Sequence, residues 1–502
     1  LNARIAYLQG HQDAALAELA QFNAPGIHPA LKYRILNLQR HIVETSGNYL
    51  QGARLGDQLL RMAPTDDAPA ISRGIWRNLQ RVDTERLQEA QLSAQDSEWR
   101  GWLELAVLSR TGPRQSTREL SAWLQNNPQH PAAGSPPGGL GYLLGQRPAL
   151  TKVALLLPVS GRLAPAGKAV RDGYLASYYA ARGTGDAMFE VLVLDLDSYE
   201  STNAAYDAAI AAGANMIVGP LSKQAVAELS SRPERTVPVL ALNRLEEAEP
   251  PVPGSTALVQ FALAPEDEAV TVADLAFGQG ARSALVLRPE GSRGAKLADA
   301  LESRWRELGG TIANSIIYGN REEYSADVKI ALDIPASEER ARAIERMLAS
   351  NIEFDARRRQ DIDVIFLLSG NGAEARSIKP LLAFHYAGNI PVYSTSSIYS
   401  GKPDPKNRDL DGINFAELPW LLGSNPDLRE TIAAGAADGM TYTRLNALGA
   451  DAFLLQLRFL QLQAGPDALL RGNTGLLSMD PKLQIRRELS LATFDGGAVQ
   501  PQ

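Results

Sequence analysis

The chain has 502 residues, of which 45% are hydrophobic and 21% are charged, and its formal net charge is −7. This length exceeds what one hydrophobic core serves, so two or three folding units are expected. The acidic balance argues against a nucleic-acid binder that works by neutralising phosphates. The absence of cysteine excludes disulfides, iron–sulfur clusters, thiolate zinc sites and cysteine nucleophiles.

Residues 1–130 predict a helical domain, because apolar residues recur at spacings of three and four in a sequence rich in Ala, Leu, Gln and Arg. Gly10 and Gly47 open two similar helical stretches, and a third candidate begins at Gly112. This weak repeat resembles a degenerate tetratricopeptide array, in which stacked helix pairs bury each other's faces. An irregular helical domain is the alternative.

Residues 131–150 predict a linker. Four prolines and five glycines stand in this stretch, so it has little to pack and is expected to sustain neither helix nor strand. The linker separates the helical domain from a module that spans 151–502.

Short apolar runs alternate with helical stretches after residue 150, which predicts βαβ units on a parallel sheet. The predicted strands are 153–157, 189–195, 216–220, 237–242, 283–287, 311–318, 364–368 and 390–394. Two successive sets predict two lobes: lobe 1 takes about 151–275 plus 430–470, and lobe 2 takes about 282–410. A helix over 265–277 connects the sets, and 319–361 predicts an insertion with a charged helix around 338–350. The predicted class is therefore α + α/β.

Catalytic motifs are missing from the sequence. The segment 161–168 resembles a P-loop, but five residues separate its glycines and Ala169 replaces the hydroxyl residue. The G-x-G-x-x-A stretch at 370–375 lacks the acid that holds a ribose, so a dehydrogenase or nucleotide enzyme is a remote alternative. Asp195 and Asp197 have no third ligand nearby, and the five histidines form no i,i+4 pair. G-x-S-x-G, S-x-x-K and K-T-G do not occur. We predict no catalytic residue, no metal and no cofactor.

Small polar residues at the predicted strand ends indicate a ligand-binding cleft between the lobes. The candidate cleft residues are Ser160, Gly161, Gly219, Ser222, Asn243, Ser369, Gly370, Thr395 and Ser396. Turns favour the same residue types, so a purely structural role is the alternative.

Two stretches, 153–173 (VALLLPVSGRLAPAGKAVRDG) and 213–222 (GANMIVGPLS), resemble the first lobe of type I periplasmic binding proteins. Further stretches at 354–367 (FDARRRQDIDVIFL), 390–401 (IPVYSTSSIYSG), 409–422 (DLDGINFAELPWLL) and 444–452 (RLNALGADA) narrow this resemblance. They resemble the penicillin-binding protein activator family of LpoA-type outer-membrane lipoproteins. The resemblance covers roughly 153–495, and the helical part matches in character more than in motif.

The resemblance implies a non-enzymatic activator that binds a class A penicillin-binding protein, a bifunctional peptidoglycan synthase, and stimulates its transpeptidase cross-linking. It implies a periplasmic location at the inner leaflet of the outer membrane. The only membrane link would be a lipid anchor whose cysteine this chain lacks, and we expect an N-terminal segment to have been trimmed before Leu1. No nucleic acid is expected as a partner. A periplasmic receptor for an amino acid or similar small ligand is the alternative function.

Candidate residues for docking a partner are Arg357, Arg358, Arg359 and Tyr399. The three arginines can neutralise an acidic partner or pair internally with Asp355, Asp361 and Asp363, and their closeness in sequence favours the internal pairs. The segment 394–400, which contains Tyr399, follows a predicted strand and faces either the cleft or the partner. The sequence does not distinguish the two.

Overall fold

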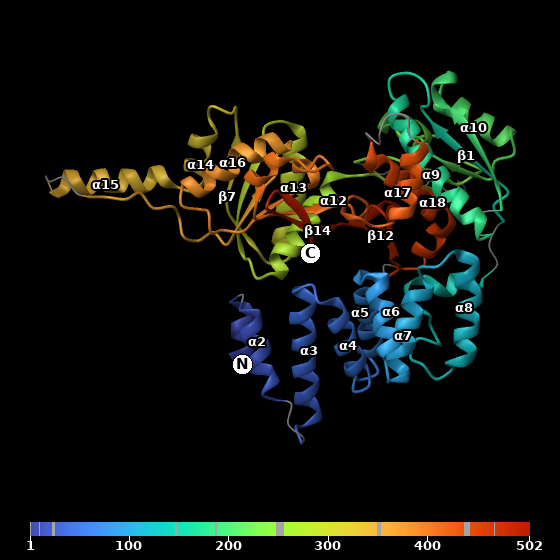
Figure 1. Cartoon of the computed structure of the whole chain (residues 1–502), viewed down its shortest axis with the longest axis horizontal. Coiled ribbons are helices and arrows are strands. Elements are labelled where there is room, and N and C mark those ends of the chain that lie inside the picture. Colours follow the sequence, from blue (N-terminus) through green and yellow to red (C-terminus); the bar gives the residue numbers. More distant parts are fainter. Residues whose placement is uncertain are drawn as a thin grey trace. The chain divides into compact units, whose positions relative to one another are not determined.

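The computed structural model describes residues 2–9, 11–22, 26–145, 149–185, 188–246, 256–348, 353–435, 442–465 and 467–502. The chain divides into two compact units, each built from separate stretches of sequence. The first unit consists of Leu1–Ala20, Pro265–Leu418 and Leu489–Gln502, and the second of Gln21–Ala264 and Pro419–Glu488. Figure 1 labels some of their helices and strands.

Helices fill the described N-terminal part of the chain. They are α1 (Asn2–Leu8), α2 (Gln12–Ala20), α3 (Pro29–Thr45), α4 (Tyr49–Leu60), α5 (Ala68–Arg81), α6 (Thr84–Ser93), α7 (Ser97–Leu108) and α8 (Pro113–Asn126). The helices α3 to α8 belong to the second unit, but α1 and α2 belong to the first, in which the Gln12 amide donates to the carbonyl of Gly278. The helical domain predicted over 1–130 is thus divided after Ala20. Gly10, the first glycine of the sequence repeat, lies outside the described residues.

An ion-pair network joins the helices α4 and α7. The buried carboxylate of Asp57 lies 3.0 Å from the guanidinium groups of both Arg54 and Arg61, and Arg61 also pairs with Asp96 at 2.6 Å. Burial raises the pKa of Asp57 to about 6, and the neighbouring arginines offset only part of that effect.

This raised pKa predicts a pH-dependent stability. The native Asp57 carboxyl holds its proton up to about pH 6, whereas the unfolded one releases it near about pH 4. Its contribution to the free energy of unfolding therefore falls as pH rises from about 4 to 6, by about 2 kcal/mol. We expect Asp57→Asn to remove this part of the pH dependence in urea titrations at about pH 4.5 and pH 7. Asp66→Asn, at an exposed position of the same region, is the control; equal pH profiles for Asp57→Asn and the parent chain would contradict the assignment.

The predicted linker contains a structured turn. Residues Pro137–Leu144 form the 3-10 helix η1, which includes two glycines with positive φ, Gly138 at 62° and Gly139 at 73°. Leu140 and Leu143 are buried. The prediction that 131–150 sustains no helix is wrong, because glycines in left-handed conformations let the chain turn tightly and bury the two leucines. Residues 146–148 lie outside the described residues.

The second unit carries a five-stranded parallel sheet in the order β2-β1-β3-β4-β5. Its strands are β1 (Lys152–Leu157), β2 (Glu190–Asp195), β3 (Met216–Val218), β4 (Val239–Ala241) and β5 (Leu258–Gln260). Sequence analysis predicted the first four and missed β5, which has only three residues. The continuous apolar runs reflect burial on both faces, since every residue of β3 and β4 is buried.

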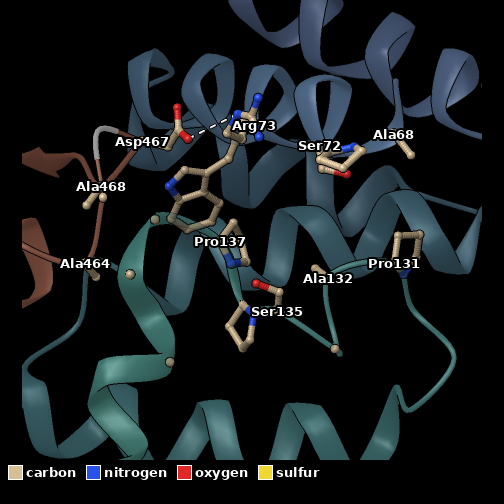
Figure 2. A pocket seen from close by; sticks show the side chains of 18 of the residues that line it. Ala68, Ser72, Arg73, Pro131, Ala132, Ser135, Pro137, Ala464, Asp467 and Ala468 are labelled. Atoms are coloured by element: carbon tan, nitrogen blue, oxygen red, sulfur yellow. Dashed lines mark ion pairs between the residues drawn. The ribbon is translucent and has the colours of Figure 1, made fainter. Parts of the chain in front are cut away.

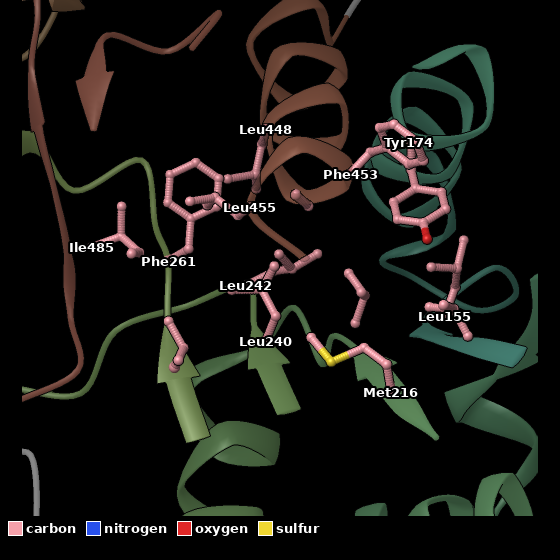
Figure 3. Packing of buried hydrophobic residues seen from close by; sticks show 14 of the residues in the cluster. Leu155, Tyr174, Met216, Leu240, Leu242, Phe261, Leu448, Phe453, Leu455 and Ile485 are labelled. Carbon is pink, nitrogen blue, oxygen red and sulfur yellow. The ribbon is translucent and has the colours of Figure 1, made fainter. Parts of the chain in front are cut away.

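Helices from distant parts of the sequence cover this sheet. They are α9 (Ala164–Gly183), α10 (Thr202–Ala211), α11 (Lys223–Ser230) and α18 (Thr443–Leu462). Figure 3 shows one core, in which Leu155 and Met216 of the strands gather with Tyr174 of α9 and Phe453 of α18. The helix α17 (Pro426–Gly435) and the small antiparallel sheet β11 (Leu470–Arg471), β12 (Leu476–Met479) and β13 (Ile485–Glu488) complete the unit. This packing places 443–462 beside the strands of the second unit.

The first unit carries a seven-stranded sheet in the order β15-β14-β10-β9-β8-β6-β7. Its strands are β6 (Ser283–Pro289), β7 (Thr311–Tyr318), β8 (Val364–Leu367), β9 (Val392–Ser394), β10 (Ile413–Glu417), β14 (Ser490–Asp495) and β15 (Ala498–Pro501). The predicted strands β6 to β9 pair in parallel, whereas β14, which the sequence did not predict, runs antiparallel to both β10 and β15. The chain returns to this sheet by a hairpin at its end, which strand periodicity did not reveal.

Besides α1 and α2, the helices described in the first unit are α12 (Pro265–Gly278), α13 (Ser292–Glu307), α14 (Tyr324–Ala331), α15 (Ile334–Leu348) and α16 (Gly372–Phe384). The predicted connecting helix thus belongs to this unit and not to lobe 1. The predicted insertion holds α14 and α15, and within this unit α15 extends away from the sheet (Figure 1). Of the charged helix predicted around 338–350, residues 349 and 350 lie outside the described residues.

Candidate functional site

Candidate cleft residues Ser160 and Gly161 lie in the loop after β1. The N–H groups of Val159 and Ser160 both donate to the carboxylate of Asp195, at 3.0 and 3.3 Å. Hydrogen bonds from the Ser160 side chain and from these N–H groups hold the pKa of Asp195 below its ordinary value. The loop therefore binds a carboxylate that the chain itself supplies.

Three other candidates, Gly219, Ser222 and Asn243, close the turns after β3 and β4. The N–H of Gly219 donates to the carbonyl of Leu240 at 2.8 Å. Ser222 caps α11 by accepting the N–H of Ala225 at 3.2 Å, and the Asn243 amide donates to the carbonyl of Leu221 at 2.8 Å. Gly219, Ser222 and Asn243 therefore use these polar groups within the chain, as residues in turns and helix caps commonly do.

The first unit has the same arrangement at the ends of β8 and β9. Glu374, in the first turn of α16, accepts hydrogen bonds from the Gly370 N–H and from the Tyr318 hydroxyl, both at 2.8 Å. The Ser396 N–H donates to the carboxylate of Glu268 at 2.9 Å. Again the chain's own carboxylates occupy N–H donors at strand ends, where a ligand anion would otherwise bind.

The remaining two cleft candidates, Ser369 and Thr395, are both buried. The hydroxyl groups of Thr395 and Ser397 are hydrogen-bonded at 2.9 Å. The Ser397 hydroxyl also donates to the carbonyl of Ser369 at 2.7 Å. The Ser369 hydroxyl finds no partner within the described part of the chain. The geometry thus brings the candidates of each unit to one sheet edge, where most of them serve the turns.

The candidate docking arginines differ in their surroundings. Arg359 forms a two-pronged ion pair with Asp361 at 2.8 Å, and Arg358 donates to the carbonyl oxygens of Tyr386 and Arg359. The carboxylate of Asp363 instead accepts the backbone N–H groups of Arg282 and Ser283, at 3.1 and 3.0 Å. Arg357 is exposed. Of the three, Arg357 is the arginine best placed to meet another molecule.

Tyr399 packs within the first unit. Its ring lies 6.0 Å from that of Phe415 and 6.1 Å from that of Phe494, centroid to centroid. Both phenylalanines come from sheet strands and are buried. The aromatic contacts give Tyr399 a role in the core, beside any role in docking.

A pocket that the sequence did not predict lies in the second unit, with a volume of about 740 Å³. Its walls come from the start of α5, the segment 131–142 and the loop after α18, and Figure 2 shows the Arg73–Asp467 ion pair beside Pro137 and Ser135. Trp76 and Trp102 also line it, and both side chains are fully buried. Because 131–150 was predicted to be an unpacked linker, no pocket was expected there. The prolines of this stretch do indicate a conformationally restricted segment, which is the kind of segment that can form a pocket wall.

Neither a cluster of metal-ligating side chains nor a membrane-spanning helix occurs in the described residues. Among them, no three His, Asp or Glu side chains are grouped so that they could hold a metal ion. None of the helices within the described ranges combines the length and hydropathy that crossing a bilayer requires.

An α/β unit with a parallel sheet, a second α/β unit with a mixed sheet, and polar turns at the strand ends define a periplasmic-binding-protein-like class of protein. A solved structure described as a putative branched-chain amino acid ABC transporter from Chromobacterium violaceum shares this fold, with a TM-score of 0.51 and 24% identity. The similarity covers 68% of this chain and 100% of that one, so it shows the fold of about two thirds of the chain.

The chain belongs to the LppC putative lipoprotein family, whose model matches residues 1–497. The penicillin-binding protein activator LpoA of Photobacterium profundum is 28% identical over 508 residues, which cover 100% of this chain and 82% of the relative. The solved C-domain of LpoA (YraM) from Haemophilus influenzae, described as a regulator of PBP1A, is 25% identical with a TM-score of 0.55. That match covers 70% of this chain and 100% of the C-domain. The family resemblance of the sequence motifs is confirmed.

Proposed function

We propose that the chain is a non-enzymatic activator of peptidoglycan synthesis that binds a class A penicillin-binding protein and stimulates its transpeptidase cross-linking. The observation that carries this proposal is similarity along the whole chain to a protein named as a penicillin-binding protein activator. The similar C-domain described as a regulator of PBP1A supports the same kind of partner. Both relatives are named for an effect on an enzyme, which supports a chain that acts without catalysis of its own.

The strand-end geometry fits this function better than solute transport. The carboxylates of Asp195, Glu374 and Glu268 occupy backbone N–H groups at strand ends. A receptor for an amino acid needs such donors for its ligand's carboxylate. A solute receptor remains the alternative because of the fold alone, and saturable binding of an amino acid with a rise in melting temperature would favour it.

The family description as a lipoprotein supports a place in the cell envelope. We propose that the full-length protein is held at the inner leaflet of the outer membrane by a lipid and reaches a synthase across the periplasm. Fractionation of cells that express the full-length protein tests this location. Recovery in the inner-membrane fraction would contradict it.

The test of the activator function is a reconstituted cross-linking reaction. A class A penicillin-binding protein is supplied with lipid II, and the cross-linked fraction of the product is measured after muramidase digestion. We expect added chain to raise the cross-linked fraction severalfold and to bind the synthase in a pull-down. Neither binding nor stimulation by a correctly folded chain would overturn the proposal.

Docking through Arg357 is tested in the same reaction. We expect Arg357→Glu to weaken synthase binding by about three- to tenfold, since reversing one interface charge affects the encounter of the two proteins. Arg162→Glu, at another exposed arginine, is the matched control. If both variants bind the synthase as the parent does, Arg357 is not part of the docking surface.

A further inference from the structure

The end of α16 holds a tyrosine in a backbone conformation that tyrosine seldom adopts. Tyr386 has a positive φ of 63°, and its N–H donates to the Ala383 carbonyl at 3.1 Å. The N–H of Ala387 donates to the Leu382 carbonyl at 2.8 Å. Helix ends closed by these two bonds usually have glycine at this position, because a Cβ is strained in the left-handed region. Tyrosine therefore makes this helix end less stable than glycine would.

Packing within the chain does not explain the conformation of Tyr386. In the described part of the chain, three other non-glycine residues have a positive φ. Asp333 and Asn425 belong to residue types that adopt this conformation readily. Leu483 packs its side chain against the core of the second unit. The Tyr386 side chain is instead 64% exposed. A strained residue with an exposed ring indicates a contact with another molecule.

Three further residues form a surface together with Tyr386. Phe384, the last residue of α16, is 73% exposed. The guanidinium of the half-buried Arg358 donates to the Tyr386 carbonyl at 2.8 Å. This bond also brings Arg357, the exposed residue before it in sequence, to the end of α16. We call Phe384, Tyr386, Arg357 and Arg358 the α16-end surface.

The positive charge of Arg358 has no partner of opposite sign in this surface. Its guanidinium donates to the carbonyl oxygens of Tyr386 and Arg359 and to the amide oxygen of Asn389. None of these acceptors is charged. The carboxylate of Asp361 is already held by Arg359 in a two-pronged ion pair. The α16-end surface is therefore complementary to a partner that supplies a carboxylate.

We propose that the α16-end surface binds an acidic segment of the class A penicillin-binding protein. Tyr386 and Phe384 contact apolar side chains of that segment, and Arg357 contacts its carboxylate. The proposal rests on the proposed function, because it names the surface through which that partner is bound. Aromatic residues and arginines contribute most of the binding energy at many protein interfaces.

Contacts within the first unit fix the backbone of this surface before a partner binds. His385, which lies between the two aromatic residues, is buried, and its ring is hydrogen-bonded to the Ser325 hydroxyl of α14 at 3.2 Å. The N–H of Arg357 donates to the Ser337 hydroxyl of α15 at 3.1 Å. Exposed aromatic side chains on a fixed backbone lose little conformational freedom on binding, which favours affinity.

The test compares synthase affinity and thermal unfolding in the same variants of the complete 502-residue chain. A purified class A penicillin-binding protein is immobilised, and binding is followed by biolayer interferometry. Tyr386→Gly is expected to raise the melting temperature by about 2–4 °C, because glycine removes the strain. The same variant is expected to weaken synthase binding by about tenfold. A damaged fold would not combine higher stability with lower affinity.

Phe384→Ala is expected to weaken synthase binding by a similar factor of about ten. Tyr179→Ala is the matched control, since Tyr179 is also an exposed aromatic residue of a helix, 63% exposed, but lies on α9 in the second unit. Its synthase affinity should equal that of the parent chain. An equal loss of affinity in Tyr179→Ala and Phe384→Ala would overturn the assignment to the α16-end surface.

Salt separates the charged contact from the apolar one. The loss of affinity in Arg357→Glu should shrink as NaCl rises from about 50 mM to about 500 mM, because salt screens exposed charges. The loss in Tyr386→Gly should persist over this range. If the loss in Arg357→Glu does not change with salt, the surface does not recognise a carboxylate through Arg357 and the proposal is overturned.

The remaining outcomes distinguish this proposal from the proposed function. A parent chain that does not bind the synthase overturns both. Equal affinities of the parent chain, Tyr386→Gly and Phe384→Ala overturn the α16-end surface alone. Sedimentation velocity tests a second copy of the chain as the occupant. Self-association that Tyr386→Gly abolishes without a change in synthase affinity would show that the surface joins two copies, and would also overturn the proposal.

Discussion

Arg458→Leu is expected to lower the free energy of unfolding of the second unit by about 3 kcal/mol, because it leaves three oxygen atoms in and around the buried contact without their charged donor. Arg458 lies on α18 and is 2% exposed. Its guanidinium donates to the Ser109 carbonyl at 3.0 Å, to the Ser116 hydroxyl at 2.9 Å and to the Thr111 carbonyl. Leucine fills part of the volume and leaves those oxygens without this donor.

These contacts, which we call the Arg458 clamp, fasten the helical array of the second unit to its α/β lobe. Ser109, Thr111 and Ser116 belong to α8 and the turn before it, whereas Arg458 comes from the far end of the sequence. We therefore expect Arg458→Leu also to speed proteolytic cleavage near residues 109–116. Urea unfolding and limited trypsin digestion measure the two effects. Arg162→Leu, at an exposed arginine of the same unit, is expected to stay within about 0.5 kcal/mol of the parent chain. A similarly small change in the free energy of unfolding for Arg458→Leu would show that the Arg458 clamp does not stabilise the second unit.

Gly449→Ala is expected to destabilise the second unit by about 3 kcal/mol, a large effect for one methyl group, because the site has no space for it. Gly449 lies on α18, where it faces α9. A Cβ at this position would overlap the carbonyl oxygen of Val170 and would lie 2.9 Å from the backbone nitrogen of Tyr174. Both neighbours are helix backbone, so the methyl group can be accommodated only by moving one helix away from the other.

Gly173 forms the other half of this close contact. A Cβ at Gly173 would overlap the carbonyl oxygen of Asn446. Once either alanine separates α9 from α18, the second costs less, so the double variant is expected to lose less stability than the sum of the single variants. Gly183→Ala, at the open end of α9, is the control and should change the stability little. If the loss of stability in the double variant equals the sum of the losses in Gly449→Ala and Gly173→Ala, the two glycines do not share one contact between α9 and α18.

The α/β class of the chain could be predicted because local sequence and tertiary burial agree there. Val153 to Leu157 form a continuous apolar run, and all five residues are buried in β1. Residues that follow the strands, such as Ser160 and Ser222, were correctly expected at strand ends. Their partners were not predictable, since the carboxylate of Asp195 is 35 residues from Ser160 and reaches it only through the pairing of β1 with β2.

The pocket and the Arg458 clamp were beyond sequence reasoning for the same physical reason. From the sequence pattern alone, Trp76 and Trp102 are ordinary core residues of helices, and Arg458 is a polar residue on the exposed side of an amphipathic helix. Only the folded chain shows that two indoles lack acceptors among the described residues and that one guanidinium is buried against carbonyl oxygens 347 and 349 residues away.

By itself, the sequence determined the broad class of this protein: helices before residue 131, two sets of βαβ units after it, no catalytic motif and a family resemblance. Those features depend on periodicity and motifs, which are local. The tertiary structure decided the rest. It divided the helical region between two units, turned the Pro- and Gly-rich stretch into a wall of a pocket and added antiparallel strands at the end of the chain. Each of these depends on contacts between residues far apart in sequence, which no local pattern encodes.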